Sequence, residues 1–187
     1  MHNIIIFGIP SLMVLVLYMF LGSFVRRAFK EKKKLVLARF LNSFGPKYNE
    51  RMHARKKDLL QDGLLRYQGE PGRRLILVEI GAGAGANFNY YPDGTVVTCV
   101  DPNDKLETFL LSNASKFPNV KFDNFHIGRA EDMSFIGSNS VDVVVCTLVL
   151  CSVDNIEKCL QEIMRILKPV SIAVTANVLY FSLLVPP

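Results

Sequence analysis

The second half of the chain alternates short apolar runs with stretches of helical periodicity. Apolar runs occupy 75–80, 96–100 and 141–150, and a weaker one occupies 122–127. Because the three stronger runs are continuous rather than alternating in hydrophobicity, they predict strands buried on both faces, as in a parallel sheet.

Helical patterns lie between these runs. Leu106, Phe109 and Leu110 share one face of a short helix. A cleaner stripe follows a start at 154–157 that resembles a capping box, and Lys168-Pro169 ends it. Its members are Ile156, Leu160, Ile163, Met164 and Leu167. Strand and helix in alternation predict a doubly wound α/β fold with a mostly parallel sheet.

The N-terminus carries the longest apolar stretch. Residues 4–25 are 22 consecutive positions without a charge, and 22 helical residues measure roughly 33 Å, enough for the hydrocarbon core. Gly22-Ser23-Phe24 is a poor signal-peptide cleavage site, so residues 1–25 predict an uncleaved membrane anchor. Pro10 leaves open whether the segment spans the bilayer or enters one leaflet as a hairpin.

A basic flank, Arg-Arg-Ala-Phe-Lys-Glu-Lys-Lys-Lys at 26–34, follows directly. Positive residues stay on the cytoplasmic side, so the rest of the chain is expected to be cytosolic. Next to an apolar stretch, anionic lipid headgroups are a better partner for such a run than nucleic acid. The sequon Asn113-Ala114-Ser115 is then expected to stay unmodified.

The flank opens a basic helical segment over 26–70. Residues 35–41 and 59–65 predict amphipathic helical stretches, broken at Gly45-Pro46, and 68–72 predicts a hinge. Charge supports this division: residues 1–74 carry fifteen Lys and Arg against five acids, and residues 75–187 carry seven against twelve. With 50% hydrophobic residues and a mean hydropathy of +0.24, the chain is too apolar to be disordered.

The four cysteines lack CxxC spacing and nearby histidines, which argues against a metal site or a disulfide framework. We expect reduced thiols, with Cys146, Cys151 and Cys159 acting as small apolar filling rather than as catalytic groups.

Candidate chemistry lies directly after the first strand. Gly81, Gly83 and Gly85 alternate there, so the backbone can turn tightly and a ligand can press against main chain. Asp101 closes the second strand, twenty residues after Gly81, where a carboxylate can accept both hydroxyls of a ribose. The loop and the acid together predict a cofactor that contains a ribose.

Two ribose cofactors fit the loop. The string also satisfies G-x-G-x-x-A, which is typical of dinucleotide binding. However, Glu79 would face an ammonium group favourably and would repel a pyrophosphate, and polar groups at 128–133 stand where an adenine edge would lie. S-adenosylmethionine has an amino acid head, a sulfonium, ribose and adenine but no phosphate, so it matches better. A nicotinamide-dependent reductase is disfavoured because neither a substrate domain nor a catalytic Tyr/Lys pair is evident.

These residues resemble the class I S-adenosylmethionine-dependent methyltransferases, which have a Rossmann-like sheet. More narrowly, the strings at 85–88, 97–103, 128–133 and 142–153 resemble the membrane-anchored methyltransferase-like group of alkyl thiol methyltransferases. The resemblance runs from the anchor to about Pro169. It implies methylation of a small lipophilic thiol at the endoplasmic reticulum membrane and lipid droplets, with the catalytic domain cytosolic.

The resemblance also implies a set of cofactor-binding residues. They are Glu79, Gly81, Ala82, Gly83, Gly85, Asp101, Pro102, Asn103, Glu131, Asp132, Cys146 and Thr147. Glu79 and the loop at 81–85 would hold the methionine end, which Cys146 and Thr147 would also line. Asp101 would bind the ribose, with Pro102 and Asn103 bordering it, and Glu131 and Asp132 would contact adenine. The family usually has Cys-Gly-Thr-Gly at 82–85, so this chain lacks one hydroxyl. No residue stands out as the general base.

The C-terminus departs from the resemblance. The cofactor-binding domain covers 71–169, and 170–187 is a divergent apolar tail in which Ile172-Ala173-Val174-Thr175 is the one candidate for a fifth strand. The sequence predicts no sixth or seventh strand, and so a sheet that is incomplete at that edge. This leaves two functions open: a membrane-anchored methyltransferase, or an inactive membrane-associated protein that retains a partial cofactor fold.

Overall fold

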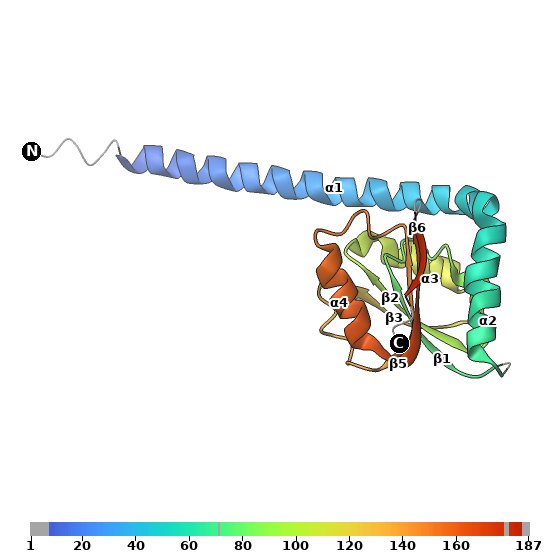
Figure 1. Ribbon diagram of the computed structural model, residues 1–187. Helices are drawn as coiled ribbons and strands as arrows, with labels where there is room; N and C mark the ends of the chain where they lie inside the picture. The colour runs from blue at the N-terminus through green and yellow to red at the C-terminus, as the bar shows by residue number, and fades with distance from the viewer. Residues whose placement is uncertain (1–7, 71, 178–179, 185–187) are drawn as a thin grey trace, which may run out of the picture. The chain divides into compact units, whose positions relative to one another are not determined.

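A six-stranded sheet organises the chain (Figure 1). The computed structural model describes the backbone of residues 8–70, 72–177 and 180–184, and the side chains of 19–70, 72–169 and 171–174. The strands are β1 (Leu75–Ile80), β2 (Thr95–Asp101), β3 (Lys121–Ile127), β4 (Val141–Thr147), β5 (Leu167–Asn177) and β6 (Tyr180–Leu184). Their order is β3-β2-β1-β4-β5-β6, and all neighbours are parallel except β5 and β6. The predicted doubly wound, mostly parallel sheet is therefore confirmed.

Alternate residues of the central strands pack on opposite faces of this sheet. Leu77 of β1 belongs to a core cluster with Leu110 of α3 (Glu107–Ala114), whereas Val78 belongs to a second cluster with Ile163 of α4 (Ile156–Ile166). Helices thus cover both faces, and the continuous apolar pattern of β1 and β4 follows from this double burial.

The helical segment before the sheet is less broken than the sequence predicts. Helix α1 (Gly8–Lys56) continues into a π-helical turn, η1 (Lys57–Asp62), and α2 (Gly63–Gln68). Helix α1 is not interrupted at the predicted break, Gly45-Pro46, since Pro46 lies inside it, but α1 turns sharply in its blue-green part before α2 (Figure 1). Proline costs a helix about 3 kcal/mol, and tertiary contacts on either side of Pro46, Leu41 against the core and the Asn49 side-chain amide to the Ala86 carbonyl oxygen, help to offset that cost.

By its internal contacts the chain divides into two compact units, residues 1–37 and 38–187, and the sheet and the site described below belong to the second. Among the residues whose side chains are described, no helix has the length and apolarity to cross a membrane. The predicted anchor at 4–25 lies mostly outside those residues, which begin at Met19, and it stays a prediction.

Helix α4 buries a different stripe from the predicted one. Its N-cap is Asn155, whose side chain accepts a hydrogen bond from the Lys158 N–H, as the capping pattern predicts. Ile163 is buried as expected, but Cys159 and Ile166 complete the buried face. Met164 is 66% exposed. Leu167 opens β5 instead of ending the helix, so α4 stops at Ile166, before the predicted end at Lys168-Pro169.

The tail provides more of the sheet than the sequence predicts. The candidate fifth strand at 172–175 is real but lies within the longer β5, and β6 then returns antiparallel to it. Leu167 pairs with Val141 and Ile172 with Val143, so the register shifts and the segment with Pro169 bulges out of the ladder. A bulge tolerates the missing proline N–H, and it lets the strand start directly at the helix end.

Candidate functional site

The glycine turn after β1 is held in a left-handed conformation at each alternate residue. Gly81, Gly83 and Gly85 have φ of 62°, 57° and 78°, a region in which side chains with a Cβ are strained. The Gly81 N–H donates to the Val100 carbonyl oxygen of β2 over 2.7 Å, which fixes the turn at the carboxyl edge of the sheet. Both alanines of the turn, Ala82 and Ala84, are buried.

A loop after β4 closes onto this turn, and sequence reasoning missed it. A Cβ on Gly81 would lie 2.2 Å from Cγ2 of Val149, so that loop occupies the space beside Gly81. Leu148 has a φ of 59°, which is unusual and costly for a residue with a branched side chain. No composition pattern marks such a residue, because only the packing against the turn requires it.

Asp101 lies at the end of β2, beside the glycine turn. Its Oδ2 accepts a hydrogen bond from the Gly83 N–H (3.2 Å) and its Oδ1 from the Asn103 N–H (2.9 Å). Burial raises the pKa of this carboxyl, and those two N–H groups oppose the rise. Asn103 is buried and Pro102 exposed. Since each carboxylate oxygen has two lone pairs, Asp101 keeps capacity for further donors.

Glu79 points into the same region from β1 and is 2% exposed. Its Oε1 accepts a hydrogen bond from the Asn87 side-chain amide over 2.7 Å. Glu79 Oε2 and the Tyr91 hydroxyl are both buried, and among the residues the structure describes neither makes a hydrogen bond of standard distance and angle, although Tyr91 lies close enough to Glu79 to favour its ionised form. Burial raises the pKa of Glu79 to about 7, against the opposing effects of Tyr91, Asn87 and Lys56. A buried carboxylate oxygen that lacks a donor fits a ligand that brings one.

Asn87 joins three elements and was not predicted as a site residue. Its Nδ2 donates to Glu79 of β1 and, over 3.3 Å, to Oγ1 of Thr147 at the end of β4. Its Oδ1 accepts a hydrogen bond from the Lys56 ammonium over 2.6 Å. Lys56 lies in the last turn of α1 and is 5% exposed. A buried lysine within a basic stretch gives no sequence signal, because its neighbours Arg55 and Lys57 are exposed.

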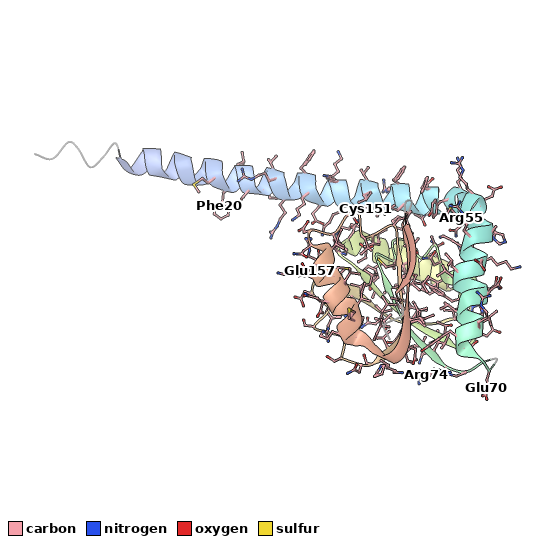
Figure 2. All side chains as sticks on the ribbon, in the orientation of Figure 1. Phe20, Arg55, Glu70, Arg74, Cys151 and Glu157 are labelled. Atoms are coloured by element: carbon pink, nitrogen blue, oxygen red, sulfur yellow. The ribbon has the colours of Figure 1, made fainter. Side chains whose placement is uncertain are left out.

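Cys146, which precedes Thr147, is fully buried. Burial raises the pKa of its thiol to about 12, so it is not a nucleophile near neutral pH. Buried Cys146 and Cys159 confirm the expectation of apolar filling, but Cys151 is exposed in the loop after β4, and the expectation is wrong there (Figure 2).

The predicted acid pair lies in the loop after β3. Glu131 Oε1 accepts hydrogen bonds from the backbone N–H groups of Asp154 (2.6 Å) and Asn155 (3.3 Å), just before α4. Asp132 is exposed, and its Oδ1 accepts from the Ser134 N–H. In the structure, therefore, Glu131 accepts from the N–H groups that precede α4, and Asp132 closes a turn.

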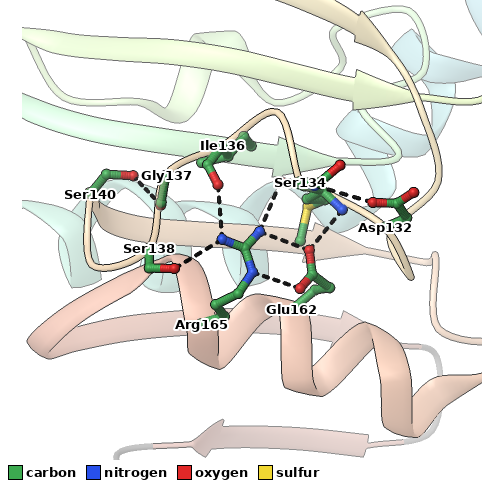
Figure 3. A network of polar contacts seen from close by, with 9 residues as sticks. Asp132, Ser134, Ile136, Gly137, Ser138, Ser140, Glu162 and Arg165 are labelled. Atoms are coloured by element: carbon green, nitrogen blue, oxygen red, sulfur yellow. Dashed lines mark hydrogen bonds and ion pairs between the residues drawn. The ribbon is translucent and has the colours of Figure 1, made fainter.

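Helix α4 holds the rest of that loop through Arg165 and Glu162 (Figure 3). The guanidinium donates to the backbone oxygens of Met133 (2.8 Å) and Ile136 (2.9 Å) and to both carboxylate oxygens of Glu162. Glu162 in turn accepts from the Met133 N–H (2.8 Å). This network fixes the loop that carries Glu131.

The carboxyl ends of three neighbouring parallel strands thus bring together the glycine turn, Glu79, Asp101 and Thr147. Ligands bind at this edge in open α/β sheets. The acid pair at 131–132 lies in the loop after β3, which begins beside Asp101, where the Gly128 N–H donates to the Asp101 carbonyl oxygen over 3.3 Å. Among the described residues no group of three or more His, Cys, Asp or Glu side chains can hold a metal ion.

This sheet and site define a Rossmann-like methyltransferase fold. The chain belongs to the methyltransferase-domain family, whose model matches residues 78–175. This membership supports S-adenosylmethionine as the cofactor.

Within this family, the chain is similar to thiol S-methyltransferases. The chain is 45% identical to the human thiol S-methyltransferase TMT1A over 130 residues, which cover 70% of this chain and 52% of the relative. It is 42% identical to human TMT1B over 126 residues, covering 66% and 50%. The chain therefore spans about half the length of the curated relatives it matches.

Solved structures support the fold. A putative S-adenosyl-L-methionine-dependent methyltransferase from Methanococcus maripaludis has a TM-score of 0.57 at 15% identity, covering 75% of this chain and 62% of that one. A methyltransferase from Aquifex aeolicus has a TM-score of 0.51 at 17% identity, covering 72% and 71%.

Proposed function

We propose that this chain binds S-adenosylmethionine at the carboxyl edge of β1, β2 and β4 and methylates small lipophilic thiols at the cytosolic face of a membrane. The observation that carries the proposal is the meeting of the left-handed glycine turn with two buried carboxylates, Glu79 and Asp101. The similarity of the chain to the thiol S-methyltransferases TMT1A and TMT1B supports the thiol substrate.

The residues fit the cofactor's chemistry. The Oε2 of Glu79, which accepts no hydrogen bond of standard geometry, suits an ammonium group. In the turn of Gly81, Gly83 and Gly85, it is Gly83 that leaves main chain open to the methionine end, with Ala82 beside it. The remaining lone pairs of Asp101 suit the two ribose hydroxyls, bordered by Pro102 and Asn103. Cys146 and Thr147 would line the methionine side, and Glu131 and Asp132 the adenine side.

Bound S-adenosylmethionine supplies an electrophilic methyl group, and the protein's part is alignment and exclusion of water. The loop at 148–153 lies against Gly81 and so stands next to the methionine side. The thiol must lose its proton to become the nucleophile, and near a pKa of about 8.5 a few per cent is ionised at neutral pH. We assign no general base.

The membrane part of the proposal rests on α1. Its described residues from Met19 to Phe29 include six large apolar side chains that are more than half exposed, Phe20 at 73% (Figure 2). They overlap the start of the basic flank at 26–34, which contains Phe29. An apolar surface beside clustered Lys and Arg favours an anionic lipid surface. We place the protein, anchored through residues 1–25, in the endoplasmic reticulum membrane and on lipid droplets.

Calorimetric titration of the full chain in detergent with S-adenosylhomocysteine tests cofactor binding. We expect micromolar binding, lost in Asp101→Ala and kept in Asp93→Ala, since the exposed Asp93 lies before β2, at the opposite end of that strand from Asp101. A folded chain that does not bind would overturn the cofactor assignment.

Turnover is tested separately, with S-adenosylmethionine and a small alkyl thiol, by detection of the methyl thioether. Cofactor binding without turnover would instead support the inactive membrane-associated protein. For the membrane, flotation with vesicles that contain anionic lipid should exceed flotation with zwitterionic vesicles. Arg26→Gln with Arg27→Gln should reduce that difference.

A further inference from the structure

Lys56 is buried in a way that its sequence context does not explain. Its ammonium donates to Oδ1 of Asn49 (2.7 Å) and Oδ1 of Asn87 (2.6 Å), and it lies 5.0 Å and 5.7 Å from the ring centres of Tyr48 and Tyr90. Burying a lysine is costly unless its charge is compensated. These contacts compensate the charge of the Lys56 ammonium. The free-energy cost of burying it indicates that the charge has a function.

The Asn87 side-chain amide links the Lys56 ammonium to the Glu79 carboxylate. Because its Oδ1 accepts from Lys56, its Nδ2 must face Glu79 and Thr147, as the distances of 2.7 Å and 3.3 Å show. An amide turned the other way would set oxygen against carboxylate and nitrogen against ammonium. The Lys56 ammonium and the Glu79 carboxylate therefore select the same amide orientation.

Lys56 also acts on the ionisation of the Glu79 carboxyl. The titratable groups that act on or near this carboxyl are Lys56 of α1, Tyr91, Cys99 and Asp101 of β2, and Cys146 of β4. Of these groups Lys56 alone is cationic, and it favours the ionised form of Glu79, whereas Asp101 disfavours it.

We propose that Lys56 is a positioning residue of the cofactor site, which acts through Asn87 to hold the Glu79 carboxylate ready for the ammonium group of the cofactor. This inference rests on the proposed function. It makes cofactor affinity depend on the last turn of α1, which lies outside the matched family region at 78–175.

The test compares two ligands that differ only at the end in question. S-adenosylhomocysteine carries the amino acid head, and methylthioadenosine keeps adenine and ribose without it. In the full chain in detergent, Lys56→Met should weaken S-adenosylhomocysteine roughly ten- to hundredfold, the range of a charge-assisted hydrogen bond. Methylthioadenosine should change less than threefold. The exposed neighbour provides the matched control, Lys57→Met, which should change neither affinity.

The pH profile separates positioning from a general loss of structure. Affinity for S-adenosylhomocysteine should fall as the pH drops through the pKa of Glu79, about 7. Lys56→Met should move this midpoint to higher pH, because the charge that favours the carboxylate is gone, and Lys56→Arg should keep it close to that of the unaltered chain. If circular dichroism shows that Lys56→Met does not fold, Lys56→Gln provides the same test.

Equal losses for both ligands, or an unchanged midpoint, would overturn the inference while leaving the proposed function standing. If the unaltered chain binds neither ligand, the proposed function and this inference fail together.

Discussion

Val149 occupies the space that a side chain on Gly81 would need: a Cβ there would come within 2.2 Å of Val149 Cγ2 and 3.3 Å of its Cβ. The glycine is therefore required twice, once by its left-handed φ and once by the loop after β4. The turn that we assign to the cofactor and the loop after β4 are thus in direct contact.

Replacement of Gly81 should separate these two requirements. Gly81→Ala combines a left-handed alanine with a steric clash, and we expect it to lower the free energy of unfolding by about 2–4 kcal/mol. Gly83→Ala has a similar φ but open space around its Cβ, so about 1–2 kcal/mol is expected. Urea unfolding followed by circular dichroism measures both.

A second substitution checks the clash itself. Val149→Ala in the Gly81→Ala background should recover part of the loss, since the contacting methyl groups are removed. If Gly81→Ala costs no more than Gly83→Ala, Val149 does not constrain the turn.

The raised pKa of Glu79 predicts a pH-dependent stability. A carboxyl whose folded pKa, about 7, exceeds its unfolded value of 4.5 stabilises the fold below the unfolded pKa, and this contribution is lost as the pH rises to 7. Relative to the unaltered chain, Glu79→Gln should therefore gain roughly 2–3 kcal/mol between pH 4.5 and 7, and nothing more above it. Urea unfolding across this range measures the difference.

The exposed Met164 gives the control, since Met164→Ala alters no titratable group and should leave the pH dependence of the unfolding free energy unchanged. A Glu79→Gln chain whose stability runs parallel to that of the unaltered chain from pH 4.5 to 8 would contradict the burial argument.

Glu131 and Asp132 are adjacent acids with different surroundings, and their substitution should differ accordingly. Glu131→Ala removes the acceptor of two backbone N–H groups before α4 and should cost about 1–3 kcal/mol. Asp132→Ala removes one exposed acceptor and should cost about 0.5 kcal/mol or less. Thermal unfolding ranks the two, and the reverse order would show that the cap is unimportant.

Arg165 should be more important to the loop after β3 than its partly exposed side chain suggests. Arg165→Gln leaves the backbone oxygens of Met133 and Ile136 and the Glu162 carboxylate without their donor, so we expect a loss of about 1–3 kcal/mol. Backbone amides in 133–136 should exchange hydrogen faster. The neighbouring exposed Met164→Ala is the control, and equal exchange in both variants would contradict the role of the network.

The sequence predicted what depends on regular patterns. Continuous apolar runs located β1, β2 and β4, and spacing placed the glycine turn and Asp101 at one edge, because strand ends meet there in any parallel sheet. Patterns could not locate Lys56, whose burial depends on a partner 31 residues away, nor β6, whose pairing with β5 comes from an apolar tail without a strand signature. The break predicted at Pro46 is not an interruption of α1, because tertiary contacts on either side of it offset the local cost of a proline in a helix.

The Lys56 contact also bears on the order of folding. Lys56 and its partner Asn49 leave the ribosome before Asn87 and Glu79 exist, so the ammonium stays hydrated until the glycine turn has formed. We therefore expect the last α1 turn to dock only after the glycine turn has formed, so substitutions of Lys56 should accelerate unfolding rather than slow folding, as rates measured in urea would show.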